Sequence, residues 1–232
     1  ELKALMISSY DTVDEPYWEK YQIKRLIDKF PEGQIVIKVN QVLAGCILSI
    51  IIEEEHFEGH HTYKQVTGDY TFNTHNPKGT ILYGIDIFIK AEYRGMRLGR
   101  RLYDYRKELC EKLNLESIVF GGRMPNYRDY QGKLTPRKYL EKVKNREIFD
   151  PVLNFHPIRV LKGYLEGDAA SNEYAVLMKW DNIYYEKPNR DIRIQKTIAK
   201  LGLVQWQMRS YPTLEELLQQ IEFFVDALSS YR

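Results

Sequence analysis

The longest patterned stretch of the chain runs from residue 81 to residue 113 and changes its hydrophobic period on the way. Between 81 and 89 apolar side chains fill every second position, with further apolar residues between them: Ile81, Tyr83, Ile85, Ile87 and Ile89, interleaved with Leu82 and Phe88. This period of two predicts a strand, and its two apolar faces place it centrally in a sheet. From residue 98 to 113 the period lengthens to three or four residues, which predicts a helix that ends near Asn114.

Between the predicted strand and helix lies a basic, glycine-bearing loop, residues 94–101. A short loop that leads into a helix leaves unpaired N–H groups at the helix start, where the helix dipole also favours an anion. Four arginines lie in this loop: Arg94, Arg97, Arg100 and Arg101. The pattern favours a phosphate-bearing ligand. An ordinary strand–loop–helix connection with a basic cap is the alternative.

The remaining periodic segments predict an alternation of helices and strands. We expect helices at 14–30, from Thr135 onward and, as a turn or two, at 150–156; strands at 34–39, 42–52 and 116–120; and a hairpin of 159–165 with 173–180. Near the end, 201–208 reads as a strand, and Thr213 with Glu216 forms a capping box for a last helix.

Residues 53–80 break the pattern, because they are polar and show no clear period. They contain four histidines and several glutamates, which would suit a metal site: His56, His60, His61 and His75, with Glu53, Glu54, Glu55 and Glu58. The spacing matches no known ligand pattern, so a solvated loop and no metal are expected. A loop this long is often functional, and this one precedes the central strand. We therefore expect it to fold over the substrate side.

Composition narrows the classes of protein further. The chain has 232 residues, 44% of them hydrophobic, which is enough for a substantial core. Its net charge of +2 argues against a polyanion-binding protein and makes any basic patch local. Two cysteines without metal spacing, Cys46 and Cys110, fit a reduced, cytoplasmic protein, and Cys110 reads as a packing residue. No signal peptide or long apolar run is present, so no membrane association is expected.

The basic loop resembles the acyl-CoA pyrophosphate loop of the GNAT-type N-acyltransferases, whose pattern is Arg or Gln, two residues, Gly, one residue, then Gly or Ala. Arg94 and Gly99 match its ends, while Arg97 stands where the middle glycine is expected. The order of predicted elements matches that family over about residues 1–180. Several segments resemble the acetyltransferase part of bacterial proteins that fuse a GNAT domain to a carbon–nitrogen hydrolase (nitrilase-type) domain: TILYGIDIFI, RGMRLGRRLYDYRKELC, GGRMPNY, DPVLNFH, YLEGD and YAVLMKW.

This resemblance implies an α/β (α+β) architecture, with a mixed central sheet of about six to seven strands flanked by helices. It implies a GNAT domain at 1–185, a linker at 186–200 and a strand–helix extension at 201–232 that resembles the start of the nitrilase-type domain. The hydrolase's catalytic residues would lie beyond Arg232, so no hydrolase activity is expected from these residues. The extension is a candidate contact for a homodimer or a hydrolase partner.

The implied activity is acetyl-CoA-dependent N-acetylation of a primary amine by direct attack. The cofactor-binding residues that follow from the family pattern are the backbone of Ile87, Phe88 and Ile89 for the pantetheine arm and carbonyl; Arg94, Gly95, Met96, Arg97, Leu98, Gly99, Arg100 and Arg101 for the pyrophosphate; and Asn126 for the cofactor arm. The acceptor stays open among a small amine, an amino acid, a polyamine and a protein N-terminus or lysine.

Three residues are candidates for the chemistry. Asp86 is the only carboxylate in the central strand, and by period two it shares a face with Leu82 and Phe88. It reads either as a general base with a raised pKa or as a buried aspartate paired with a core arginine. The resemblance puts His156 at the position of the family's acid, at the end of a helix before the hairpin; a surface or capping histidine is the alternative. Tyr127 is the back-up acid.

Two other classes compete with the enzyme. One is a GNAT domain that binds acyl-CoA without turnover, as a sensor or beside a hydrolase; the replaced glycine and the missing usual acid favour it. The other is nucleic-acid binding through residues 94–107, which ranks last because the arginines cluster at one loop with no interleaved aromatic stripe.

Overall fold

The computed structural model of the protein describes residues 1–9, 18–56, 59–150, 152–153, 156–169, 171–187 and 213–229. The chain divides into two units, Glu1–Lys187 and Pro188–Arg232. Each unit is described by itself below.

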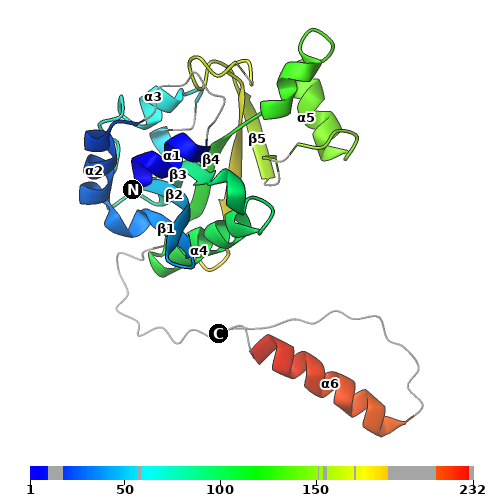
Figure 1. The fold of residues 1–232 in the computed structure, drawn as a ribbon. Coiled ribbons are helices and arrows are strands. Elements are labelled where there is room, and N and C mark those ends of the chain that lie inside the picture. Colours follow the sequence, from blue (N-terminus) through cyan, green and yellow to red (C-terminus); the bar gives the residue numbers. More distant parts are fainter. Residues whose placement is uncertain are drawn as a thin grey trace. The chain divides into compact units, whose positions relative to one another are not determined.

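The first unit alternates helices and strands along the chain (Figure 1). Its helices are α1 (Leu2–Ser9), α2 (Lys20–Lys29), α3 (Tyr63–Val66), α4 (Leu98–Lys112) and α5 (Pro136–Lys144). Its strands are β1 (Ile35–Val39), β2 (Val42–Ile52), β3 (Ile81–Ile89), β4 (Ser117–Arg123), β5 (His156–Leu161) and β6 (Ala175–Asp181). Short 3-10 turns lie at Pro31–Gly33, Glu54–His56, Ala91–Tyr93 and Pro125–Tyr130.

The six strands form one mixed sheet in the order β1-β2-β3-β4-β6-β5. Only β3 and β4 run parallel among these strands, because α4 crosses over between them, while every other neighbouring pair is antiparallel. The mixed sheet flanked by helices confirms the predicted fold class, and β3 lies centrally as its two apolar faces require. The predicted strand 201–208 lies outside the described residues.

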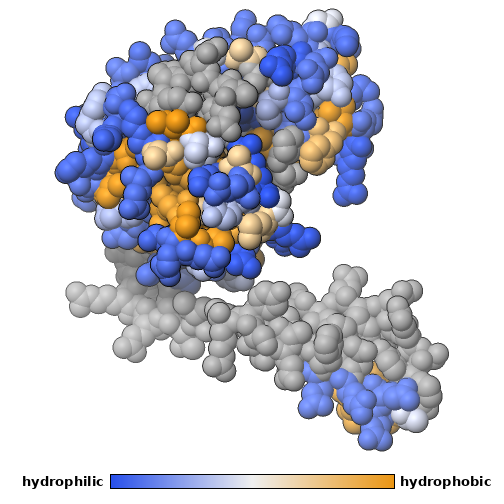
Figure 2. Space-filling view, viewed as in Figure 1, coloured by the Kyte–Doolittle hydropathy of each residue, from blue (hydrophilic) through white to orange (hydrophobic). Residues whose placement is uncertain are grey.

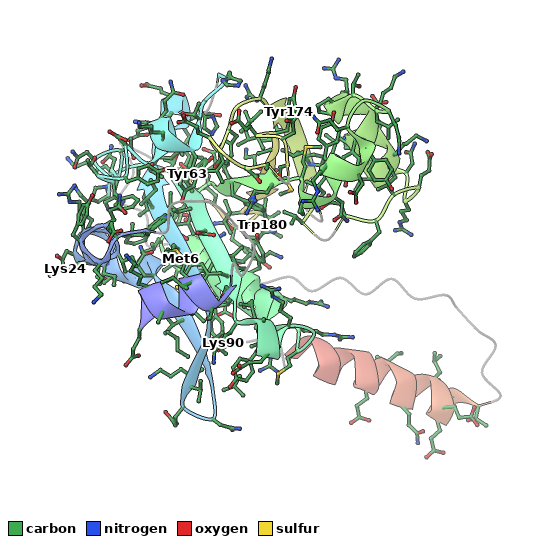
Figure 3. All side chains as sticks on the ribbon, turned by 45° about the horizontal axis from the view of Figure 1, so that its top comes forward. Met6, Lys24, Tyr63, Lys90, Tyr174 and Trp180 are labelled. Carbon is green, nitrogen blue, oxygen red and sulfur yellow. The ribbon has the colours of Figure 1, made fainter. Side chains whose placement is uncertain are left out.

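Two apolar cores lie on opposite faces of the sheet. One contains side chains from α1, α2 and α3 together with Tyr83 and Phe88 of β3. The other contains Leu82 of β3, Cys110 of α4 and the α5 residues Tyr139 and Leu140. Met6 of α1 belongs to the first core, and α1 lies over β2 and β3 (Figure 3). The central strand is therefore covered on both sides, which explains why neither of its faces is polar.

Some local predictions hold and others are wrong. The hairpin turn at Asn40 and Gln41 is present, and both residues have positive φ, as a tight turn between twisted strands requires. The helix predicted at 14–30 begins only at Lys20, where the Gln22 side chain accepts a hydrogen bond from the Glu19 N–H. Residues 10–17 lie outside the described part, and helix α1 before them was not predicted.

The helix predicted at 150–156 is also wrong. Residues 152 and 153 are not helical, and His156 begins strand β5. The residue before a proline is disfavoured in helical conformation, and Pro157 follows His156 directly. The N–H groups of Val152 and Leu153 donate to the Asp150 carboxylate instead of continuing a helix. His156 consequently lies on an outer strand of the sheet and not at the end of a helix.

The segment 53–80 is more buried than a solvated loop. Its described residues include the short helix α3, which Thr62 caps by accepting a hydrogen bond from the Gln65 N–H. His61, Tyr63, Val66 and Phe72 are all buried in this segment. Apolar side chains spaced without a period can fill a core from an irregular segment, so the polar composition of the stretch was misleading.

The second unit contains helix α6 (Leu214–Ser229). The Glu216 N–H donates to the Thr213 hydroxyl at 3.3 Å, which bears out the predicted cap at Thr213. Throughout the described parts of both units, no helix is long and apolar enough to cross a membrane.

Candidate functional site

A bulge interrupts the central strand. Strand β2 pairs Ser49 with Gly84 and Leu48 with Asp86, so Ile85 is an extra residue on β3. An extra residue shifts the alternation of side chains by one position. Asp86 therefore faces the same side as its partner Leu48, together with Tyr83 and Phe88, and not the side of Leu82 that period two predicts.

A buried arginine from α4 holds this bulge. The Arg106 side chain is 1% exposed, and its Nη2 donates to the carbonyl oxygens of Leu48, at 2.8 Å, and Asp86, at 3.3 Å. Gly84 leaves the room for it, because a Cβ there would lie 2.6 Å from Arg106 Nη1. Burial lowers the pKa of Arg106 to about 10, while Tyr103 and then Asp86 oppose the change. Arg106 is thus charged at neutral pH, and it bonds the Asp86 carbonyl oxygen.

Beyond the bulge, strands β3 and β4 separate. Their parallel pairing ends at Gly84 and Phe120, although β3 continues to Ile89 and β4 to Arg123. The Lys90 N–H donates to the Ala44 carbonyl and therefore points toward β2. Because the direction of the backbone groups alternates along a strand, those of Phe88 and Asp86 also point toward β2. The C=O groups of Ile87 and Ile89 and the N–H of Ile89 then face the opening, while the Ile87 N–H donates to Asp86 Oδ1. This arrangement fits the backbone contacts to a pantetheine arm expected at 87–89.

Asp86 lies beside this opening. It is half-buried, and its Oδ1 accepts a hydrogen bond from the Ile87 N–H at 2.8 Å. A carboxylate at this point can accept a proton from a group in the opening, since a carboxylate oxygen carries more than one acceptor site.

The predicted phosphate loop is open to solvent. Residues 94–97 are exposed, including Met96 at 52%, while Leu98 anchors the start of α4 in the core. Arg97 is the residue that caps α4, and it adopts the left-handed conformation with φ 58° and ψ 21°. Gly95 also has positive φ, at 83°. The arginine that replaces the expected middle glycine therefore occupies a conformation that glycine adopts without strain.

The backbone of this loop is available to an anion. Among the described residues, the N–H groups of 95–100 donate to no other group, and the first helical bond of α4 runs from Arg101 to Arg97. Cβ atoms added at Gly95 or Gly99 would meet nothing within 4 Å. Arg97, Arg100 and Arg101 are exposed around this helix start. Bare amides, open space and positive charge together fit a diphosphate.

The side chain of Arg94 has a further contact. Its Nη2 donates to the Ser9 carbonyl at the end of α1, which ties the loop to the first helix. This bond uses one of the five guanidinium N–H groups, so Arg94 keeps donors for a phosphate.

Of the other sequence candidates, Tyr127 and Asn126 each donate a side-chain hydrogen bond to a backbone carbonyl, and His156 lies on a strand. The Tyr127 hydroxyl donates its proton to the Leu134 carbonyl at 2.9 Å, and its ring packs against Tyr139 and Tyr174 in the core. The Asn126 side-chain amide donates to the Phe149 carbonyl. Only the backbone position of His156, on β5, is described. The helix-end reasoning that nominated it as an acid does not hold.

Sequence reasoning missed one polar cluster. His61 Nε2 lies 2.9 Å from the Tyr83 hydroxyl, which lies 3.0 Å from the Tyr164 hydroxyl, and all three side chains are buried. Tyr83 belongs to β3 and Tyr164 follows β5. The odd spacing of the histidines hid this contact, although a tyrosine in the middle of a central apolar strand is a signal that its hydroxyl has a buried partner.

Two other kinds of site receive no support. No group of histidine, cysteine, aspartate and glutamate side chains within the described ranges could hold a metal ion. Both cysteine thiols are buried, and burial raises the pKa of Cys46 and of Cys110 to about 12. They remain protonated at neutral pH and are packing residues.

Comparison with known proteins agrees with this geometry. The model of the acetyltransferase (GNAT) family matches residues 2–131. The "Uncharacterized N-acetyltransferase YkwB" of Bacillus subtilis is 35% identical over 179 residues, which are 75% of this chain and 79% of that protein. The "Probable hydrolase YhcX" of the same organism is 35% identical over 223 residues. That match takes in 93% of this chain but only 43% of YhcX, so the chain spans less than half of that relative.

Two solved structures share the fold. The loading GNATL domain of CurA from Lyngbya majuscula superposes with a TM-score of 0.66 and 22% identity, covering 78% of this chain and 92% of that domain. A GNAT-like decarboxylase, GphF, in complex with isobutyryl-CoA gives a TM-score of 0.63 and 19% identity, covering 78% and 93%. At these identities the likeness concerns the fold alone.

Proposed function

Because the chain belongs to the acetyltransferase (GNAT) family, whose members transfer acyl groups, we propose that it moves an acetyl group from acetyl-CoA to a primary amine. One observation carries the proposal. The N–H groups of residues 95–100 at the start of α4 donate to no other described group. They follow β3 in the chain, the strand that separates from β4. Diphosphate site and opening thus follow each other along one segment, as a long acyl-CoA requires.

The residues fit the donor in two places. The amides of Met96 to Arg100 would hold the diphosphate, with Arg94 and Arg100 adding charge. The Ile87 C=O and the backbone N–H and C=O of Ile89 would hold the pantetheine arm, since they face the opening and the Ile87 N–H is bonded to Asp86. When bound, the thioester supplies an activated acyl carbon that an amine can attack directly.

Asp86 is proposed to receive the first proton. A primary amine arrives as an ammonium ion at neutral pH and must lose one proton before its lone pair can attack. The Asp86 carboxylate lies beside the opening, where its Oδ1 accepts a hydrogen bond from the Ile87 N–H, and it can take this proton. The proposed acceptor is a small-molecule or peptide amine. The proposed location is the cytoplasm, a reducing compartment.

A second function has its own support. The relative YhcX is named a probable hydrolase, and this chain spans only 43% of it. A domain that binds acyl-CoA without turnover and works beside a carbon–nitrogen hydrolase would keep the phosphate loop but would not need Asp86. In that case α6 and the residues before it would contact the hydrolase part.

Two measurements separate these functions. CoA should raise the melting temperature of the protein in both cases, because a ligand that binds only the folded state stabilises it. Free thiol release with acetyl-CoA and a panel of primary amines is expected only for the enzyme, and Asp86→Asn should lower it by about 10²-fold or more. Thiol release at the wild-type rate in Asp86→Asn would remove Asp86 from the mechanism, and no release with any amine would favour the binding module.

A further inference from the structure

A hydrogen-bond network in the core joins three distant parts of the sequence. His61 Nε2 lies 2.9 Å from the Tyr83 hydroxyl, and that hydroxyl lies 3.0 Å from the Tyr164 hydroxyl. His61 is 4% exposed, Tyr83 0% and Tyr164 3%. The rings of both tyrosines also meet the imidazole edge-on. Buried polar groups linked in this way satisfy one another and polarise one another in a low dielectric.

One end of this hydrogen-bond network reaches the opening between β3 and β4. Gly121 is the first β4 residue beyond the last β3–β4 pair, and a Cβ added to it would lie 2.6 Å from the Tyr164 hydroxyl oxygen. Burial raises the pKa of the Tyr164 hydroxyl, and the negative charge of Asp86 raises it further. Tyr164 therefore presents its hydroxyl where the strands part, on the same face as Asp86.

The other end of the network, His61, is a base. Burial lowers the pKa of His61 below its usual value, and the neighbouring His60 and the Arg159 side chain from β5 lower it further. The Gly59 carbonyl, 3.5 Å from Nδ1, opposes the change and accepts the proton on Nδ1. The imidazole is then neutral at pH 7 with Nε2 as the acceptor. In this tautomer Tyr83 donates to His61, Tyr164 donates to Tyr83, and the Tyr164 oxygen can accept an incoming proton.

We propose that Tyr164, Tyr83 and His61 form a proton relay that serves the attacking amine and the leaving thiolate. The inference rests on the acyl transfer proposed above. Tyr164 is the group that contacts the reacting atoms, whereas Tyr83 and His61 act through it. No residue of the relay belongs to the family pattern that pointed to the phosphate loop.

The relay moves the second proton of the amine. After the nitrogen has bonded to the acyl carbon it still carries an excess proton, which passes to the Tyr164 oxygen. The Tyr164 proton passes to Tyr83, and the Tyr83 proton passes to His61 Nε2. When the carbon–sulfur bond breaks, the same proton returns through Tyr83 and Tyr164 to the sulfur. The products are an amide and a free thiol, and His61 is neutral again. Asp86 takes only the earlier proton of the ammonium ion and releases it to solvent before the next cycle.

Interruption of the relay at its middle is the sharpest test. Tyr83→Phe and His61→Gln are each expected to lower kcat for thiol release by about 10²-fold, within the usual range for general acid–base catalysis. The double variant should be no slower than either single variant, because one substitution already stops proton transfer through the relay and the second has nothing further to remove. Tyr139→Phe is the matched control: this buried hydroxyl donates to Asp150 at 2.7 Å, outside the relay. It should lower the melting temperature similarly and leave kcat unchanged.

Two further readouts would not respond to a purely structural role. The wild-type kcat should fall on the acid side, where His61 becomes charged and can no longer accept a proton, and His61→Gln should lack this fall. Nitrogen NMR of the imidazole in the free protein should show the proton of His61 on Nδ1 at pH 7. A proton on Nε2, or an unchanged kcat in Tyr83→Phe, would overturn the relay alone. Absence of thiol release by the wild-type protein with every amine would overturn the acyl transfer as well.

Discussion

Replacement of Gly84 with alanine should destabilise the fold by displacing the buried Arg106 side chain. The new Cβ would lie 2.6 Å from Arg106 Nη1 and 3.0 Å from the Phe120 Cβ, and the guanidinium cannot move without loosening its bonds to two carbonyls. Overpacking of a core costs about 1–3 kcal/mol. Hydrogen bonds from a charged group contribute about 1.5–3 kcal/mol each, part of which is lost. The expected destabilisation is about 3 kcal/mol, or roughly 6–12 °C in melting temperature for a chain of this size.

A double-mutant cycle measures whether Arg106 is the cause. The free energy of unfolding is determined in urea for wild type, Gly84→Ala, Arg106→Met and the double variant. If Gly84 exists to admit the guanidinium, the alanine should cost at least about 1 kcal/mol less in the Arg106→Met background, which is a typical coupling for residues in contact. Gly59→Ala, with no atom within 4 Å of the added carbon, is the near-neutral control. Strictly additive costs would refute the reasoning.

Three more perturbations follow from the same coordinates. Arg97→Gly should raise the melting temperature by about 1–4 °C, since the left-handed conformation costs a non-glycine residue about 1–2 kcal/mol and the added chain entropy of glycine offsets only part of the gain; a lower melting temperature would contradict this. His61 and His75 both have lowered pKa values, chiefly through burial, so the unfolded chain binds more protons below pH 6.5 and the free energy of unfolding should decrease from pH 7.5 to pH 5. The pH slope should be smaller in His75→Gln. Asp168→Asn should cost about 2 kcal/mol in urea unfolding, because the nearly buried carboxylate accepts a bidentate pair from Arg123; an unchanged midpoint would show that the pair contributes nothing.

The sequence predicted the scaffold of the site well, and the reasons are local. The alternation at 81–89, the turn at Asn40 and the helix from Leu98 all depend on near neighbours in the chain, which a hydrophobic period reports directly. The open, basic start of α4 follows from the same local pattern. The helix start at Thr135 and the cap at Thr213 are both predicted from the local sequence, and both threonine hydroxyls accept a backbone hydrogen bond at a helix start.

Features that depend on distant contacts escaped the sequence. The extra residue at Ile85 exists only relative to the pairing with β2, so no period along β3 could reveal it. The burial of His61 depends on Tyr164, more than a hundred positions later, and its segment reads as polar. His156 was assigned by analogy to a helix end, and the proline after it favours extended backbone.

Loops usually absorb insertions and deletions without harm, whereas the interior of a central strand seldom does. Here a single extra position, Ile85, determines on which face of the sheet the only carboxylate of β3 lies. Excision of that one codon would remove the bulge and place Asp86 directly after Gly84, so Asp86 would stay on the side of Tyr83; regular pairing of the unchanged sequence is what would turn it to the side of Leu82.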